Sequence, residues 1–473
     1  MAGSYPSCII RLQKTSAKIF WNYNSHYLCN FNPIILFLKP HAKICAACFT
    51  TNNCYGNASR IKTNRRQQNT WKETGYFRAD NICYIYIELS LITFMVHIQC
   101  MSTCKRIDKM IPYVKTLKKH WEIITLLAIT IIRLSLRLYH LDWQCLTIDE
   151  RYTWIFVSSH TFTDSISIAI MRPDNSLYYP FAILSCNLLN EISVYAIRLP
   201  SLIFGVLTIP VSYLVGKEYN NKITGILISG FIALSFPFIY YSQNARSYMP
   251  VLLTFLIFTY FFIKFLRGDT GLKTMIPLCI SSILCLYAHQ YALVPMTIAC
   301  ILALYYNGRK IWKYALVTLA ITVPAIYYNR NYIPAIFYNY PREYNNPFWV
   351  SWDKIAIMLP SELFGMMWII IFFLFIYSLY KKHNAVSISF ATIGILTMIS
   401  CLPMTLVLAM SSRYVLLVSP MILLVALDPI SDFIDGYIED SKKIALTIAA
   451  LFIFEAFTWF SWISWTTFNI CQL

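Results

Sequence analysis

Charge is scarce in this sequence, and acidic side chains are the scarcest. Asp, Glu, Lys and Arg make up 13% of the 473 residues, and only 22 residues are acidic. A soluble domain has about a quarter of its residues charged. A Gly-rich phosphate loop is missing as well, which argues against a fold that binds a nucleotide-sugar. The composition therefore points away from a soluble globular protein.

Long apolar runs dominate the chain instead. Hydrophobic residues form 58% of it, and the mean hydropathy is +0.53. Continuous apolar runs of about 18 or more residues indicate transmembrane helices. The sequence thus predicts an all-α, polytopic membrane helix bundle of about eleven spans. They are expected at about residues 121–139, 195–215, 222–241, 248–266, 274–289, 291–306, 312–328, 364–380, 386–409, 414–430 and 443–462.

Lysine and arginine give the predicted orientation of these spans, because cytoplasmic loops are enriched in them. Basic residues stand at alternate junctions, near Lys115, Lys217, Arg267, Arg309, Lys381 and Lys442. These junctions share one side of the membrane if residues 177–190 lie in the interface rather than across it. The opposite, exoplasmic side then begins with a long first loop, residues 140–194.

Residues 1–110 are predicted to form a basic N-terminal extension. The first 120 residues hold 17 Lys and Arg against 4 acidic residues. Anionic lipid or nucleic acid would attract such a segment, but a cytoplasmic flank is the simpler explanation, and no nucleic-acid partner is expected. Cys45 and Cys48 form a C-x-x-C pair, yet no second pair follows at zinc-site spacing. We expect this extension to be poorly ordered and residues 111–473 to form the transmembrane domain.

An unusual acidic stretch, Asp149-Glu150-Arg151-Tyr152, follows the first predicted span. In one interpretation, Asp149 and Glu150 are a general base and its supporting acid, since a carboxylate can take the proton of an attacking hydroxyl. In the other, they are a solvated or helix-capping pair at the N-terminus of a juxtamembrane helix. Residue chemistry alone does not choose between the two.

Arginines recur on the predicted exoplasmic side, where the positive-inside rule predicts few. Arg172, Arg246 and Arg413 could bind an anion, because a guanidinium holds a phosphate through two parallel hydrogen bonds. Alternatively, they reach toward lipid headgroups or pair with Asp149 or Glu150. For each arginine taken alone, the second explanation is the more common.

Four stretches of the chain resemble a known enzyme class. They are Asp149-Glu150-Arg151-Tyr152, Arg172-Pro-Asp-Asn-Ser-Leu-Tyr-Tyr179, Ser235-Phe-Pro-Phe-Ile-Tyr-Tyr-Ser-Gln-Asn-Ala-Arg-Ser-Tyr248 and Ser412-Arg-Tyr-Val-Leu-Leu-Val-Ser-Pro420. Their order and predicted side resemble the polyprenol-phosphate-sugar-dependent glycosyltransferases of the GT-C class. The nearest branches are the protein O-mannosyltransferase-like and the lipid A aminoarabinose transferase-like enzymes. The resemblance covers about residues 120–430.

The second stretch departs from the family pattern. Its usual Lys or His is Arg172 here, and its usual second proline is Asp174, a spare carboxylate. No large carboxy-terminal soluble domain follows the spans, so we expect a compact, prokaryote-type enzyme.

The resemblance implies that one sugar moves, with inversion, from a polyprenyl or dolichyl phosphate to a hydroxyl acceptor. It implies Asp149 as the base and Glu150 as the residue that orients the acceptor or holds Asp149. The implied ligands of the donor phosphate are Arg246, Arg413 and Arg172. Further substrate-binding candidates are Arg151, Tyr152, Asp174, Tyr248 and His289, although a lone histidine is more often structural. The expected setting is the exoplasmic face of the plasma membrane, among membrane lipids.

Other functions stay open at this point. No cofactor is expected, although Asp149, Glu150 and His289 could in principle hold a divalent metal. A transporter or flippase of lipid-linked sugars would also need many spans and interfacial arginines. Transporters, however, tend to have internal repeats and ionisable groups near the bilayer midplane, and no repeat is found here. A catalytically inactive scaffold of the same fold is the third alternative.

Overall fold

The structure is a computed structural model, and it describes the helical part of the chain. The described residues are 120–138, 141–142, 146–171, 177–328, 360–407, 413, 415–437, 443, 446–447 and 450–451. They all belong to one compact unit, Leu89–Leu473. The predicted N-terminal extension, residues 1–110, lies outside the described residues.

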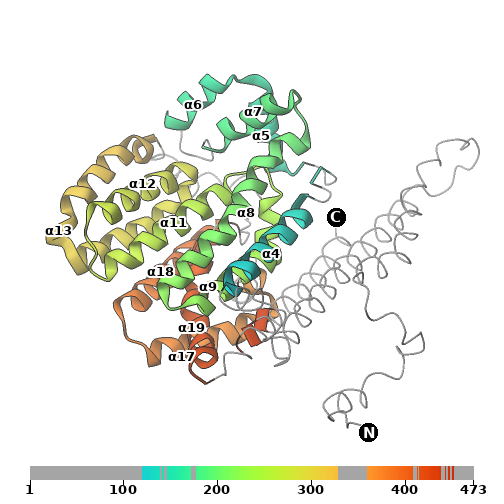
Figure 1. Cartoon of the computed structure of the whole chain (residues 1–473). Helices are drawn as coiled ribbons and strands as arrows, with labels where there is room; N and C mark the ends of the chain where they lie inside the picture. The colour runs from blue at the N-terminus through green and yellow to red at the C-terminus, as the bar shows by residue number, and fades with distance from the viewer. Residues whose placement is uncertain are drawn as a thin grey trace, which may run out of the picture. The chain divides into compact units, whose positions relative to one another are not determined.

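Every regular element among these residues is a helix (Figure 1). The first group is α4 (Trp121–Leu138), α5 (Ile148–Ser159), α6 (Phe162–Met171), α7 (Tyr178–Leu189) and α8 (Val194–Tyr219). Then follow α9 (Lys222–Leu234), α10 (Phe236–Ser242), α11 (Tyr248–Leu266), α12 (Leu272–Ala288), η2 (Gln290–Ala292) and α13 (Leu293–Tyr328). The last group is η4 (Gly365–Met367), α17 (Trp368–Lys381), α18 (Ala385–Val407) and α19 (Ser419–Tyr437). The predicted all-α fold class is confirmed.

Helices α4, α8–α13 and α17–α19 lie where the first ten spans were predicted, whereas most of the eleventh, 443–462, lies outside the described residues. In the described part of the chain, α8 and α11 are long and apolar enough to cross a membrane. A third span results if α9 and α10, which are bent by 59° at their junction, count as one. The sixth and seventh predicted spans form one element, α13, with a kink at Asn307, whose φ of −142° and ψ of 31° are not helical.

Helix α8 lies at the centre of the bundle. It packs against α4, α7, α9, α10 and α11, and Figure 1 shows α4, α8, α9 and α11 side by side. Small residues bring α8 and α9 close together, because a Cβ atom on Gly216 would lie 2.8 Å from the Cα of Gly225. Such small-residue contacts are typical of helix packing in membranes, where apolar burial alone does not drive association.

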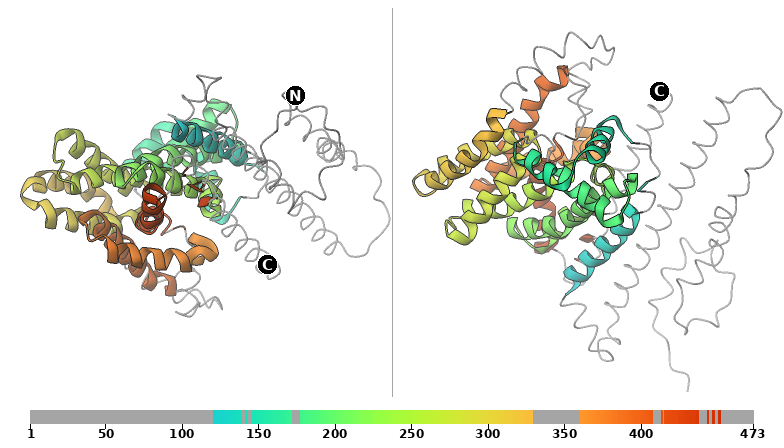
Figure 2. Two further views of the ribbon diagram at one scale, coloured as in Figure 1. Left: turned by 60° about the horizontal axis from the view of Figure 1, so that its bottom comes forward. Right: turned by 90° about the horizontal axis from the view of Figure 1, so that it is seen from above.

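Helices α5, α6 and α7 lie together at one end of this bundle (Figure 1 and Figure 2). One face of α7 buries Tyr178, Ala182 and Ile183 against the structure. Its other face exposes Leu184 and Leu188, at 42% and 73%. An exposed apolar face of this kind is what a helix in the membrane interface requires, and the interfacial location of residues 177–190 stays a prediction.

A buried arginine, Arg137, forms hydrogen bonds to both helices at the bend between α9 and α10. The Arg137 side chain is fully buried; its Nε donates to Ser242 Oγ at 2.9 Å, and its Nη2 donates to the Ile232 carbonyl at 3.4 Å. In return, Gln243 Nε2 donates to the Arg137 carbonyl at 3.1 Å. A bent helix leaves carbonyls without helical partners, and a side chain that bonds them makes the bend tolerable. This contact fixes the start of the segment Gln243–Ser247, which leads into the site.

Candidate functional site

The acidic pair lies in the first turn of α5, and a capping box fixes that turn. Glu150 N donates to Thr147 Oγ1 at 3.3 Å, and Thr147 N donates to Glu150 Oε2 at 3.0 Å. The two bonds satisfy N–H groups that a helix start leaves open. The capping interpretation of the sequence therefore applies to Glu150, and Asp149 lies one residue before it.

Glu150 also forms a buried ion pair with Arg198 of α8. Arg198 Nε donates to Glu150 Oε1 at 2.7 Å and Arg198 Nη2 to Oε2 at 2.9 Å, and the side chains are 3% and 1% exposed. Burial raises the pKa of Glu150, but the bonds from Arg198, Ala245 and Thr147 outweigh it and leave this pKa below its ordinary value. Glu150 is thus ionised at neutral pH, with both oxygens engaged.

The same carboxylate holds the segment Gln243–Ser247. The backbone N–H of Ala245 donates to Glu150 Oε1 at 2.9 Å, and Thr153 Oγ1 of α5 donates to the Ala245 carbonyl at 2.9 Å. From α8, Ser201 Oγ donates to the Arg246 carbonyl at 3.0 Å. Helices α5 and α8 therefore fix the backbone from which Arg246 projects.

Asp149 contacts two of the other predicted site residues. Arg413 Nη1 donates to Asp149 Oδ2, and the Tyr248 hydroxyl makes a long hydrogen bond of 3.5 Å to the same oxygen. The Asp149 side chain is 30% exposed and that of Arg413 26%. Residues from the starts of α5 and α11 and from the segment before α19 thus meet at one carboxylate. Unlike Glu150, Asp149 keeps access to solvent.

Arg246 lies beside this cluster. Its Nε atom is buried and has no hydrogen-bond partner within the described structure. Burial lowers its pKa, but Tyr248, Tyr179 and Asp149 more than compensate, so the pKa ends above its ordinary value. A guanidinium that is buried and always charged is suited to bind an anion.

His289, in the turn that follows α12, packs against the Tyr248 ring. Its ring centre lies 5.8 Å from that of Tyr248, and its Nδ1 accepts the backbone N–H of Tyr291 at 3.2 Å. Burial, with help from Arg246 and Arg413, lowers the pKa of His289 to about 3. The ring is therefore neutral, and because Nδ1 accepts, Nε2 carries its proton.

The remaining predicted residues are not brought into this cluster. The side chains of Arg151 and Tyr152 are exposed, Tyr152 at 62%. Arg172 and Asp174 lie outside the described residues. Within the described ranges, no group of three His, Cys, Asp or Glu side chains is placed to hold a metal ion. Arg198 is the residue that sequence reasoning missed, although a cation inside a predicted span normally has a partner and so signals a site.

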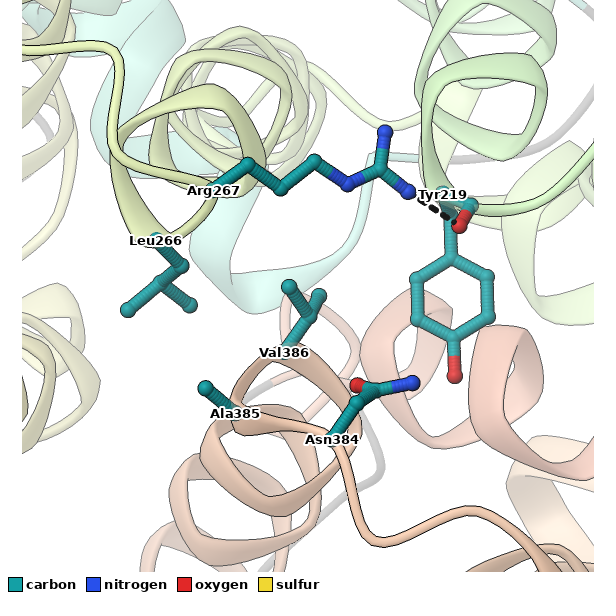
Figure 3. Close-up of a pocket in the computed structure, with 6 residues that line it drawn as sticks. All are labelled: Tyr219, Leu266, Arg267, Asn384, Ala385 and Val386. Atoms are coloured by element: carbon teal, nitrogen blue, oxygen red, sulfur yellow. Dashed lines mark hydrogen bonds between the residues drawn. The ribbon is translucent and has the colours of Figure 1, made fainter.

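A separate cavity lies at the opposite end of α8 (Figure 3). It has a volume of about 260 Å³ and is lined by Tyr219, Leu266, Arg267, Asn384, Ala385 and Val386. Arg267 donates from Nη2 to the Tyr219 carbonyl at 2.8 Å and pairs with Glu218 at 3.1 Å. The lining holds no carboxylate and no histidine, the side chains that most often act as general acids and bases.

The candidate site combines an accessible carboxylate, two arginines, a phenol and a neutral imidazole. Asp149 can accept a proton from a hydroxyl group. Arg246 and Arg413 can bind an anion together. Such a site suits the transfer of a group that leaves an anion behind, with a hydroxyl as the acceptor.

Comparisons with known proteins identify the fold. No protein-family model matches the chain, and no curated protein matches its sequence. The structure is similar to that of ArnT from Cupriavidus metallidurans bound to undecaprenyl phosphate, with a TM-score of 0.50 and 14% identity over 70% of this chain. The apo form of the same protein aligns with a TM-score of 0.48, 12% identity and 67% of this chain. The aligned part spans 63% of the ArnT chain in the first case and 60% in the second.

The likeness to the form bound to undecaprenyl phosphate shows the fold alone. ArnT resembles this chain in its arrangement of helices, with very few identical residues. The predicted GT-C resemblance is thus confirmed at the level of architecture. The described chain has the GT-C-type, membrane-protein helical fold of ArnT.

Proposed function

We propose that this protein is an integral-membrane glycosyltransferase that moves a sugar from a polyprenyl phosphate to a hydroxyl acceptor. The observation that carries the proposal is the meeting of Asp149, Arg413 and Tyr248 beside Arg246. The fold shared with ArnT, one of whose structures contains undecaprenyl phosphate, supports a lipid phosphate as the donor. The sugar and the acceptor are left unnamed, because no described residue distinguishes among them.

The proposed reaction is a single displacement at the anomeric carbon. The acceptor oxygen forms the new bond to that carbon while the bond to the phosphate oxygen breaks, and Asp149 takes the hydroxyl proton. The configuration at the anomeric carbon is inverted. Arg246 and Arg413 stabilise the negative charge that grows on the leaving phosphate, which is often a large contribution in a water-poor site. Arg172, were it to contact the phosphate, would act in the same way.

Of the two roles that the sequence left open for Glu150, this proposal takes the one that holds Asp149. Its oxygens are engaged by Arg198, Ala245 and Thr147, so it is a positioning residue that sets where Asp149 and Arg246 stand. Direct contact with the acceptor is left to Arg151, Tyr152, Asp174 and the Nε2–H of His289, which stay predictions.

The proposed location of the site is the exoplasmic face of the plasma membrane. Arg198, near the start of α8, bonds Glu150, whereas Tyr219, at its end, accepts from Arg267. The 26 residues of α8 separate these ends by about 39 Å, enough to cross a bilayer. Lys217, Lys222, Arg267 and Lys381 gather at the Tyr219 end, which the positive-inside rule makes cytoplasmic.

Transfer of a radiolabelled sugar tests the proposal. Purified wild-type protein is mixed with short-chain polyprenyl phosphate sugars and cell-envelope acceptors, beside Asp149→Asn at matched expression and thermal midpoint. We expect transfer by the wild type and a loss of at least about a hundredfold in the variant, since a positioned base contributes about 10²–10⁴-fold. Equal transfer by both would remove Asp149 from the mechanism. No transfer by the wild type with any sugar would favour a transporter or an inactive scaffold.

A further inference from the structure

The arginine that would bind the donor phosphate is held by the carboxylate that would act as base. Arg413 Nη1 donates to Asp149 Oδ2. In the proposed reaction these groups have different partners, because Asp149 faces the acceptor hydroxyl and Arg413 faces the phosphate. The contact between Arg413 and Asp149 is therefore one that the proposed reaction would have to break.

The charges around the Asp149–Arg413 pair would be balanced by one further negative charge. Arg246 and Arg413 bring two positive charges, and Asp149 brings one negative charge. Glu150 and Arg198 neutralise each other in their buried pair, and His289 is neutral. One positive charge is in excess among these described residues. A sugar joined to a polyprenol through a phosphodiester carries one negative charge, which would balance it.

The Asp149–Arg413 ion pair is also easier for another anion to displace than the neighbouring Glu150–Arg198 pair. Arg198 and Glu150 share two hydrogen bonds and are 3% and 1% exposed. Arg413 and Asp149 meet through Nη1, and they are 26% and 30% exposed. A partly exposed ion pair is weak, so an incoming phosphate can displace it. Arg246, beside Asp149 and with a buried Nε that has no hydrogen-bond partner in the described structure, provides a second cation for the same phosphate.

We infer that the donor phosphate and Asp149 compete for Arg413, so that the donor binds first and its binding frees the base for the acceptor. This inference rests on the proposed function and adds its order of events. Before the donor arrives, Arg413 Nη1 donates to Asp149 Oδ2. Once Arg413 turns to the phosphate, Asp149 keeps its contact with Tyr248, and Oδ2 can accept from the acceptor hydroxyl instead.

Binding of a short-chain polyprenyl phosphate without sugar tests the competition. Affinities are measured on the full-length protein in lipid nanodiscs at one salt concentration, for wild type, Asp149→Asn, Arg413→Gln and the double variant. We expect Asp149→Asn to bind the lipid phosphate about two- to fivefold more tightly, the range that an exposed ion pair corresponds to. Arg413→Gln should bind more weakly. In the Arg413→Gln background, adding Asp149→Asn should bring little further gain.

Two outcomes would overturn the inference. Equal or weaker binding by Asp149→Asn would show that Arg413 is not in competition. A gain of the same size in the Arg413→Gln background would show that Asp149 simply repels the phosphate through space. Asp164→Asn is the matched control, because Asp164 is an exposed carboxylate of the same loop that bonds Thr161 and does not contact Arg413 in the described structure; its affinity should equal that of wild type.

The transfer assay separates this inference from the proposed function. If the wild type transfers sugar but Asp149→Asn gains no affinity, the function stands and the order of events is wrong. If no variant binds the lipid phosphate and no sugar is transferred, both are overturned. Thermal midpoints within about 2 °C of wild type are required of each variant before its affinity is compared, and a variant outside that limit is replaced by Asp149→Ser or Arg413→Met.

Discussion

The carboxylate of Glu150 binds the side chain of Arg198 and the backbone N–H of Ala245, at 2.7 and 2.9 Å. Asp149 precedes Glu150 in the chain, and Arg246 follows Ala245. One buried carboxylate therefore places the accessible acid beside the buried cation, although the two are distant in sequence. Glu150 contributes to the site through these neighbours.

Removing Arg198 should destabilise the protein strongly. Arg198→Met leaves Glu150 buried and charged, and breaking a buried ion pair in this way costs about 3–5 kcal/mol. The Glu150 carboxylate then keeps its hydrogen bonds from Thr147 and Ala245 but has lost the positive charge of Arg198. A lower thermal midpoint in detergent, with a loss of sugar transfer larger than the loss of folded protein, is the expected result.

The double variant Glu150→Gln/Arg198→Met is the control for this experiment. It removes both charges, so most of the stability should return. Transfer should stay impaired, because a neutral amide holds the N–H of Ala245 less strongly than a carboxylate does. A single variant Arg198→Met with wild-type stability would contradict the importance of the buried pair.

His289 should make the protein less stable as the pH falls. Its pKa is lowered to about 3 in the folded chain from an ordinary 6.5. Between these values the unfolded chain binds a proton that the folded chain does not, so the free energy of unfolding decreases as the pH falls below about 6.5. From pH 7.5 to 5.5 the loss is about 1 kcal/mol for this one group.

Thermal midpoints of the wild type and His289→Gln at pH 7.5 and 5.5 measure this contribution. The wild type should lose more stability than the variant over that interval, because glutamine does not titrate. Parallel losses in the two proteins would mean that the imidazole is protonated in the folded state.

Much of the fold follows from the sequence, since apolar runs and basic junctions depend only on neighbouring residues. The predicted spans at 248–266 and 195–215 differ from α11 and α8 by no more than four residues at any end. The kink at Asn307 lies at the boundary that the sequence places between the spans 291–306 and 312–328, so α13 consists of two helices that meet there.

The candidate site was predictable only in part. Asp149, Tyr248 and Arg413 could be named because each stands in a family-like motif on the predicted exoplasmic side. Which acid binds which arginine could not be predicted, since Asp149 and Glu150 are adjacent and the helix turns them to different sides. Arg198 bonds one and Arg413 the other, and both pairs depend on how distant helices pack.

A second ionic cluster should support the opposite end of the bundle. Lys382 pairs with Asp428 at 2.7 Å and with Asp432 at 2.8 Å, and Asp428 is only 2% exposed on its side chain. Lys382→Met removes this cation and leaves Asp428 with the amide of Asn220, which donates to it at 2.7 Å. A charge left with fewer bonds costs about 1–3 kcal/mol, which a lower thermal midpoint would report.

Glu218→Gln is the comparison for that variant. Glu218 pairs with Arg267, and these side chains are 26% and 47% exposed, so the substitution should cost less than about 1 kcal/mol. Sugar transfer by both variants should match the amount of folded protein, because the cluster is far from Asp149. A transfer defect in Lys382→Met at full stability would show that this end of the bundle is coupled to the site.

Close packing of α8 on α9 should make Gly216 intolerant of a side chain. A Cβ atom there would lie 2.7 Å from a methyl carbon of Ile228 and 2.8 Å from the carbonyl oxygen of Thr224, and the backbone atom cannot move aside as a side chain can. Gly216→Ala is therefore expected to separate the two helices. The protein should lose about 1–3 kcal/mol of stability, the usual cost of overpacking, which a thermal midpoint measures.

Gly436→Ala, in α19, is the matched control for Gly216→Ala, because a Cβ atom at Gly436 meets nothing within 4 Å. That control should be neutral or slightly stabilising, since alanine is the better helix former. If the thermal midpoints of the two variants were equal, the close α8–α9 contact would not contribute to stability. Arg198 and Ser201, which α8 carries into the site, would then have to be held by other helices.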